Sequence, residues 1–227
     1  MALPPSKRSS PQAVDRFLKQ SRDITAFVEK NPRLLFAIDA TASRQPTWDV
    51  ACQLQGEMFR ATHRTASLAI QLCYYRGFHD FFASPWLTDS LELARTMATV
   101  HCEGGHTQIG RLLQHALDEH RRVPVKAVVF IGDAIEENPD TLCNLAGQCG
   151  LLQLPLFMFL EGREQAAKQA FSQMAKLSGG AFARFDQHSA DRLARLLGAV
   201  ASYASGGRKA LEADNSEIAK QLLKQLP

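Results

Sequence analysis

The sequence predicts an α/β fold: a doubly wound, mostly parallel central sheet with one antiparallel edge strand. Two observations lead to this prediction. Short apolar runs of strand length, such as Leu34 to Asp39 and Val125 to Ile131, alternate with longer segments whose apolar residues recur at helical spacing. These runs are apolar at nearly every position, which is typical of parallel strands that helices cover on both faces.

Composition indicates an ordinary globular domain. The chain has 227 residues, of which 45% are hydrophobic and 22% charged, a size that suits one α/β domain with extensions. A net charge of +3, with the basic residues spread out, argues against nucleic acid as a partner. Five cysteines without a paired framework suggest a reducing compartment. Without a secretory signal or a bilayer-length apolar stretch, we expect a cytoplasmic protein with no membrane partner.

The first 32 residues are predicted to form an extension of the domain. Residues 1–9 are polar and rich in proline, and we expect a disordered tail. Ser10-Pro11 is typical of a helix N-cap followed by proline at the first helical position, and apolar residues at helical spacing continue to about Pro32. This helical extension, residues 10–32, either packs on the domain or docks a partner, and both interpretations stay open.

The domain proper is predicted over residues 33–204. Its first strand, Leu34 to Asp39, is followed by a helix that begins near Pro46. A second strand from Ser67 to Tyr75 leads through a short turn to Phe78 to Phe82. That last segment is the second arm of a hairpin, and we expect it to be the antiparallel strand at the edge of the sheet.

Strands and helices continue to alternate through the second half of the chain. A helix with Asp89 near its start precedes a loop, and Thr107 opens the next helix. Three further strands and three further helices are expected at 125–131, 138–150, 154–160, 162–177, 181–185 and 191–203. Residues 205–227 begin with a glycine-rich hinge and carry a second apolar stripe, which predicts an appended C-terminal helix.

Polar side chains follow the ends of the predicted strands. Asp39 ends the first strand, and Thr41 and Ser43 come at alternate positions after it. Thr107 follows a glycine-rich loop, and Asp133 follows another apolar strand. Because open α/β sheets bind ligands at the carboxyl ends of their strands, these side chains are candidates for one site. All of them offer oxygen, which is the ligand atom that Mg²⁺ prefers.

Three of these segments resemble the metal-ion-dependent adhesion site of von Willebrand factor A-type (VWA) domains. Asp39-Ala40-Thr41-Ala42-Ser43 is similar to the family's Asp-x-Ser-x-Ser motif, with Thr41 in place of the usual serine. Gly104 to Gly110 is similar to its second loop, and Ile131-Gly132-Asp133 to its third. Their order and wide spacing also match, and the resemblance covers about residues 33–203. It implies a Rossmann-like VWA fold.

The resemblance also implies a function. It assigns Mg²⁺ or Mn²⁺ to a site made by Asp39, Thr41, Ser43, Thr107 and Asp133. A divalent cation would offset the repulsion between the two carboxylates and leave a position for an Asp or Glu of a partner. The chain would then be a metal-dependent protein–protein interaction module. Isolated intracellular bacterial members of the family act as adaptors or assembly factors, some of them alongside AAA+ ATPases.

Two other functions are open. The first is a phosphate-ester hydrolase with Asp39 as nucleophile. Enzymes of that kind carry a second acid where Thr41 stands, and the sequence has no Gly-x-Ser-x-Gly elbow and no Walker-type loop, so we expect a protein that is not an enzyme. The second is a structural scaffold with a vestigial site, because each of the five residues taken alone is also explained as a helix cap or a turn.

A zinc site is the remaining candidate. His101, Cys102 and His106 lie close together in the sequence. They lack the paired spacing of zinc ligands, and the sequence dictates no fourth ligand. A loop beside the second motif explains them more simply.

Overall fold

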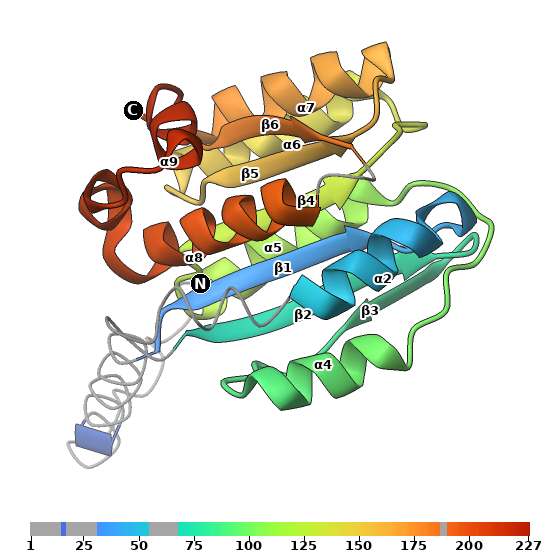
Figure 1. Ribbon diagram of the computed structural model, residues 1–227, viewed down its shortest axis with the longest axis horizontal. Helices are drawn as coiled ribbons and strands as arrows, with labels where there is room; N and C mark the ends of the chain where they lie inside the picture. Colours follow the sequence, from blue (N-terminus) through green and yellow to red (C-terminus); the bar gives the residue numbers. More distant parts are fainter. Residues whose placement is uncertain (1–14, 17–30, 55–67, 187–189) are drawn as a thin grey trace, which may run out of the picture.

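The computed structural model describes residues 15–16, 31–54, 68–186 and 190–227. The centre of this part of the chain is a six-stranded sheet in the order β3-β2-β1-β4-β5-β6 (Figure 1). The strands are β1 (Arg33–Asp39), β2 (Ala69–Arg76), β3 (Asp80–Ala83), β4 (Ala127–Gly132), β5 (Leu156–Glu161) and β6 (Ala181–Phe185). All neighbours pair in parallel except β2 and β3, which form the antiparallel hairpin at the edge. The predicted fold class is confirmed.

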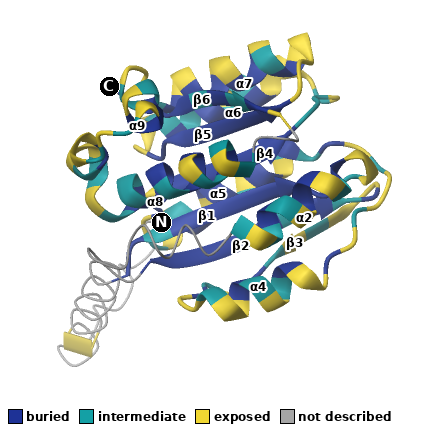
Figure 2. Ribbon diagram, in the orientation of Figure 1, coloured by how far each residue is buried: buried dark blue, intermediate teal, exposed yellow. Residues whose placement is uncertain are grey.

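Helices cover both faces of the sheet. One face carries α2 (Gln45–Leu54), α4 (Ser90–Ala98), α8 (Ala190–Ala213) and α9 (Glu217–Leu223). The other carries α5 (Ile109–Arg122), α6 (Pro139–Leu151) and α7 (Gln165–Ser178). Successive residues of β1 point into opposite cores, Leu34 and Phe36 into one and Leu35 into the other. Figure 2 shows the consequence: the central strands are buried between the helices, whereas the edge strand β3 is partly exposed.

Several helix ends follow the chemistry that the sequence predicts. The side chain of Asn138 accepts a hydrogen bond from Asp140 N, with Pro139 at the first position of α6. Gly179 ends α7 in the left-handed conformation, with φ of 71°. Thr107, however, does not open α5, which begins two residues later at Ile109. The first turn of α5 is instead capped by Glu137, which lies in the loop after β4. Its carboxylate accepts hydrogen bonds from the backbone N–H groups of Ile109 and Gly110.

The C-terminal region is part of the main core. α8 runs past its predicted end at Tyr203 and past the predicted boundary at residue 204, with a break at Gly207 (φ 64°, ψ −159°). Leu222 of α9 has no exposed surface. The Gln225 side chain both donates to and accepts from the backbone of Phe182, which occupies hydrogen-bonding groups at the free edge of β6. The expected appended helix is therefore buried with the rest of the domain.

Most of the predicted N-terminal extension, including the tail at residues 1–9, lies outside the described residues. Its packing or docking stays a prediction. None of the described helices is both long enough and apolar enough to cross a membrane.

Candidate metal centre

The structure brings all the predicted ligands to one place. A depression of about 220 Å³ is lined by Asp39, Thr41, Ser43, Thr107 and Asp133. It lies at the carboxyl edge of the sheet, where Asp39 ends β1 and Asp133 follows β4, the strand beside β1. This is the position at which open α/β sheets bind ligands.

Asp39 is a buried carboxylate whose hydrogen-bond donors, within the described residues, are neutral groups. It is 1% exposed. Its Oδ1 accepts a hydrogen bond from the backbone N–H of Thr41 (2.7 Å), and its Oδ2 accepts one from the hydroxyl of Tyr75 (3.1 Å). Burial raises the pKa of Asp39 from 3.8 to about 6; these hydrogen bonds oppose the rise, and the charge of Asp133 adds to it. A cation beside Asp39 would therefore relieve an electrostatic cost.

Asp133 is the more accessible carboxylate, with 29% of its side chain exposed. Its Oδ2 accepts a hydrogen bond from the hydroxyl of Ser43 (3.1 Å) and lies 3.3 Å from Nη1 of Arg44. Within the described part of the chain, Oδ1 of Asp133 makes no hydrogen bond. One oxygen of this carboxylate is thus held by the protein, and the other is left for a ligand.

Thr107 and Glu136 connect the second and third loops. The hydroxyl of Thr107 accepts a hydrogen bond from the backbone N–H of Glu136 (3.1 Å), and Oε2 of Glu136 accepts one from the backbone N–H of Thr107 (3.0 Å). Glu136 also lies 3.0 Å from Nδ1 of His106 and lines the depression. Sequence reasoning missed Glu136, although its place three residues after Asp133 in the same loop was a usable signal.

The two glycines of the second loop, Gly104 and Gly105, have different steric surroundings. A Cβ on Gly105 would lie 1.8 Å from the carbonyl oxygen of Gly77, whereas a Cβ on Gly104 would meet nothing within 4 Å. Gly105 is therefore required by the close approach of the second loop to the β2–β3 turn. The steric constraint comes from this backbone contact and needs no bound ion to explain it.

Arg44 is the other residue that sequence reasoning missed. It directly follows Ser43 and is only 2% exposed. Its guanidinium donates to a carboxylate oxygen of Glu161, the last residue of β5, and to the hydroxyl of Thr47 (2.5 Å). It also reaches Asp133, so one cation serves two carboxylates.

Comparison with known proteins adds the fold family. No family model and no curated protein matches the sequence. The structure is similar to an aerotolerance-related membrane protein from Bacteroides fragilis (TM-score 0.56, 15% identity, 73% of this chain and 96% of that chain). It is also similar to the SpRpn10 VWA domain (TM-score 0.55, 12% identity, 70% of this chain and 90% of that chain). A third similar structure is the vWF domain of the type V pili tip protein Mfa5 from Porphyromonas gingivalis (TM-score 0.56, 11% identity, 74% of this chain and 93% of that chain). The chain has a VWA fold. At these identities the likeness shows the fold alone.

The donor set at the depression of this VWA fold suits a hard divalent cation. It consists of carboxylate and hydroxyl oxygens, which Mg²⁺ and Mn²⁺ favour. Asp133 and Glu161 share the guanidinium of Arg44, whereas Asp39 accepts its hydrogen bonds from the neutral groups of Thr41 and Tyr75, so among these groups negative charge exceeds positive charge. The residues therefore fit such an ion.

The candidate zinc ligands have different surroundings. Within the described ranges, no group of three or more His, Cys, Asp or Glu side chains is arranged to hold a metal ion. Burial raises the pKa of the Cys102 thiol to about 11, which disfavours the thiolate that zinc requires. His106 is instead paired with Glu136.

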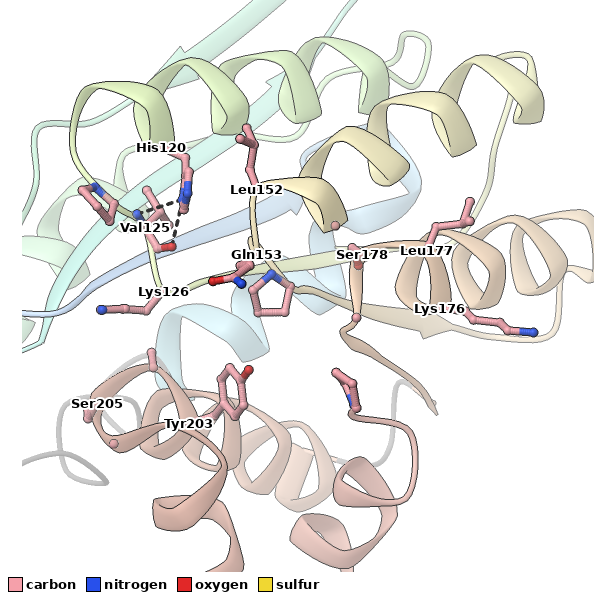
Figure 3. A pocket seen from close by; sticks show the side chains of 18 residues that line it. His120, Val125, Lys126, Leu152, Gln153, Lys176, Leu177, Ser178, Tyr203 and Ser205 are labelled. Atoms are coloured by element: carbon pink, nitrogen blue, oxygen red, sulfur yellow. Dashed lines mark hydrogen bonds between the residues drawn. The ribbon is translucent and has the colours of Figure 1, made fainter.

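A larger cavity, of about 960 Å³, opens at the opposite edge of the sheet, where β4, β5 and β6 begin (Figure 3). Its lining, as far as the structure describes the chain, includes no Asp or Glu side chain. Nδ1 of His120 lies within hydrogen-bonding distance of the backbone of Val125 (3.1 Å from its O and 3.2 Å from its N). The amino groups of Lys126 and Lys176 point away from its centre (Figure 3). Its charged groups do not converge as those of the depression do.

Proposed function

We propose that this VWA-fold domain binds Mg²⁺ or Mn²⁺ at Asp39, Thr41, Ser43, Thr107 and Asp133 and, through the ion, an Asp or Glu side chain of a partner protein. The observation that supports this most strongly is the pairing of a buried, neutrally contacted Asp39 with Asp133 in a depression that opens to solvent. Such a pair of carboxylates is costly without a cation and is well compensated by a divalent one.

The residues have distinct tasks in this proposal. Asp39 and Asp133 supply charge, and the three hydroxyls supply neutral oxygen, either directly or through water. Tyr75 orients Asp39 through its hydrogen bond, and Asp133 orients Ser43 in the same way. The ion would attract an anionic side chain at a position that the protein leaves open.

The fold supports an interaction module. VWA domains typically mediate protein–protein interactions. The partner would supply an acidic group, and the chain would act as an adaptor or assembly factor. From the resemblance of the motifs, a partner linked to an AAA+ ATPase is one candidate. A cytoplasmic location belongs to the same proposal.

The hydrolase alternative has less support. Asp39 is almost fully buried, and each of its oxygens already accepts a hydrogen bond from Thr41 or Tyr75. A nucleophile has to reach the phosphorus atom of its substrate, and this carboxylate is poorly placed to do so. The scaffold alternative differs from the main proposal in a single respect, namely that its binding would not depend on metal.

Affinity capture tests the proposal. The wild-type chain is immobilised in Mg²⁺, and the proteins it retains from a lysate are compared with those retained in EDTA and by Asp39→Ala. We expect the same partner proteins to be lost in both cases. Retention of an identical set in EDTA and by the variant would favour the scaffold and contradict a metal-dependent function.

A further inference from the structure

The guanidinium of Arg44 lies at the boundary between the candidate metal centre and a second buried carboxylate. Nη1 is 3.3 Å from Oδ2 of Asp133, which is a candidate ligand, and Nη2 contacts Oε2 of Glu161, which does not line the depression. Arg44 and Glu161 are 2% and 3% exposed, so solvent screens this arrangement little.

Arg44 and Glu161 each have a hydrogen-bonding atom that the described residues leave unused. Among the described residues, Oε1 of Glu161 and Nε of Arg44 are both buried and have no hydrogen-bond partner. An arginine and a carboxylate can form two parallel hydrogen bonds, but this pair uses a single carboxylate oxygen. A second place for the guanidinium is therefore already present on Glu161.

We propose that Arg44 is a resident cation of the site, which pairs with Asp133 while no metal is bound and shifts onto Glu161 when a divalent cation arrives. This inference rests on the proposed metal binding, because it describes how that binding is regulated. Arg44 touches neither the ion nor the partner in this account. It acts by holding Asp133.

The consequence is an affinity set by a pair of residues outside the ligand set. The positive charge of Arg44 beside Asp133 opposes the approach of a second cation. Glu161 weakens that opposition, because it offers Arg44 an equivalent partner. Removing Glu161 alone should therefore weaken metal binding, whereas removing both members of the pair should strengthen it.

Two variants separate this role from simple packing. Glu161→Gln keeps the shape of the side chain and leaves Asp133 as the one charged partner of Arg44 among the described residues, so we expect the Kd for Mn²⁺ to rise roughly tenfold. Arg44→Met/Glu161→Leu removes the positive charge that lies beside Asp133, so we expect the Kd for Mn²⁺ to fall roughly tenfold. Replacing a buried ion pair with apolar groups of similar volume usually preserves folding, which a thermal melt would check.

An exposed ion pair far from the site provides the matched control. Arg121 and Asp118 lie 3.0 Å apart near the end of α5. Arg121→Met/Asp118→Leu makes the same change in charge at the opposite edge of the sheet, and we expect no change in the Kd for Mn²⁺. All four proteins are titrated with MnCl₂ in a calorimeter under the same conditions.

The outcomes separate the two proposals. A higher Kd for Glu161→Gln together with a lower Kd for Arg44→Met/Glu161→Leu supports the role of Arg44. Binding of Mn²⁺ by the double variant alone, with none by the wild type, also supports this role, but the proposed function of the wild type then fails. If the wild type binds Mn²⁺ and both variants bind more weakly or equally, the role of Arg44 is overturned and the proposed function stands. If no protein binds Mn²⁺, both proposals fail.

Discussion

The two edges of the sheet differ in size and in chemistry. The depression at the carboxyl edge has a volume of about 220 Å³, and that of the cavity at the amino edge is about 960 Å³. The smaller one is lined by Asp39, Asp133 and Glu136, whereas the described residues that line the larger one include no Asp or Glu. Convergent charged groups, rather than volume, therefore locate the candidate functional site in this fold.

The difference also has an energetic side. Asp39 is held in a place that raises its pKa, which means that its ionised form destabilises the fold. Active and binding sites commonly trade stability for function in this way. The amino edge adjoins the packed C-terminal region, where buried apolar surface provides stability. Variants at the two edges should therefore separate stability from cation binding.

The largest expected effect on stability is near the amino edge. Leu222 of α9 is fully buried in the core, so Leu222→Ala should lower the free energy of unfolding by about 2–5 kcal/mol. The Kd for Mn²⁺ should not change, because α9 supplies none of the proposed ligands. Urea unfolding and calorimetry would measure the two quantities. A loss of stability below about 0.5 kcal/mol would show that α9 is not part of the core.

At the carboxyl edge the sign of the effect should reverse. Asp39→Asn removes a buried charge. A pKa raised from 3.8 to about 6 corresponds to a cost of about 3 kcal/mol for the ionised form. In EDTA at pH 8 the variant should therefore have a higher free energy of unfolding than the wild type, by up to that amount. It should also lose cation binding. Urea unfolding in EDTA would check this. A destabilised variant would mean that the Asp39 carboxylate stabilises the metal-free fold.

The same carboxylate predicts a pH dependence. Asp39 binds its proton more tightly in the native protein than in the unfolded chain. The protonated carboxyl therefore contributes to the free energy of unfolding fully below pH 3.8, and this contribution is lost as the pH rises through about 6. In EDTA, the stability of the wild type relative to Asp39→Asn should therefore fall over this range. Urea unfolding at a series of pH values would measure the difference. A constant difference would exclude a raised pKa for Asp39.

A smaller effect is expected at the second loop. Thr107→Ala removes a neutral oxygen that water could replace, so the Kd for Mn²⁺ should rise less than for either aspartate variant. It also removes the acceptor for the backbone N–H of Glu136, which should cost about 1 kcal/mol of stability. Thr99→Ala, at an exposed threonine that ends α4, is the control. A Thr107→Ala variant that loses binding as completely as Asp39→Ala would show that Thr107 is indispensable.

The smallest effect is expected inside the larger cavity. Lys176→Ala removes a charged side chain that points away from the cavity centre, so stability should change by less than about 0.5 kcal/mol and cation binding should not change. Thermal melts and calorimetry would measure both. A clear change in the Kd for Mn²⁺ would break the distinction between the two edges.

Local patterns predicted much of this structure. The strand at 181–185 and the cap of α6 at Asn138 follow the sequence closely, because strand periodicity and capping chemistry involve neighbouring residues. The convergence of Asp39 and Asp133 at the ends of β1 and β4 could be predicted because parallel strands place their carboxyl ends together. Glycine at 179 likewise marked the end of α7.

Features that depend on distant residues could not be predicted. The inward direction of Arg44 is set by Glu161, 117 residues away, and the link from Thr107 to Glu136 joins two loops 29 residues apart. The extra length of α8 and the burial of α9 likewise come from tertiary packing, since a glycine pair in a sequence usually indicates a helix end.

Calorimetric titration of MnCl₂ into the wild type and Asp39→Ala tests the central claim most directly. The account predicts one bound ion per wild-type chain and none for the variant, because Asp39 is one of only two carboxylates in the proposed ligand set. Asp133→Ala should resemble Asp39→Ala if its carboxylate binds the ion directly, and should lose less if it acts through water. Wild-type protein that binds no divalent cation at millimolar concentration would contradict the account.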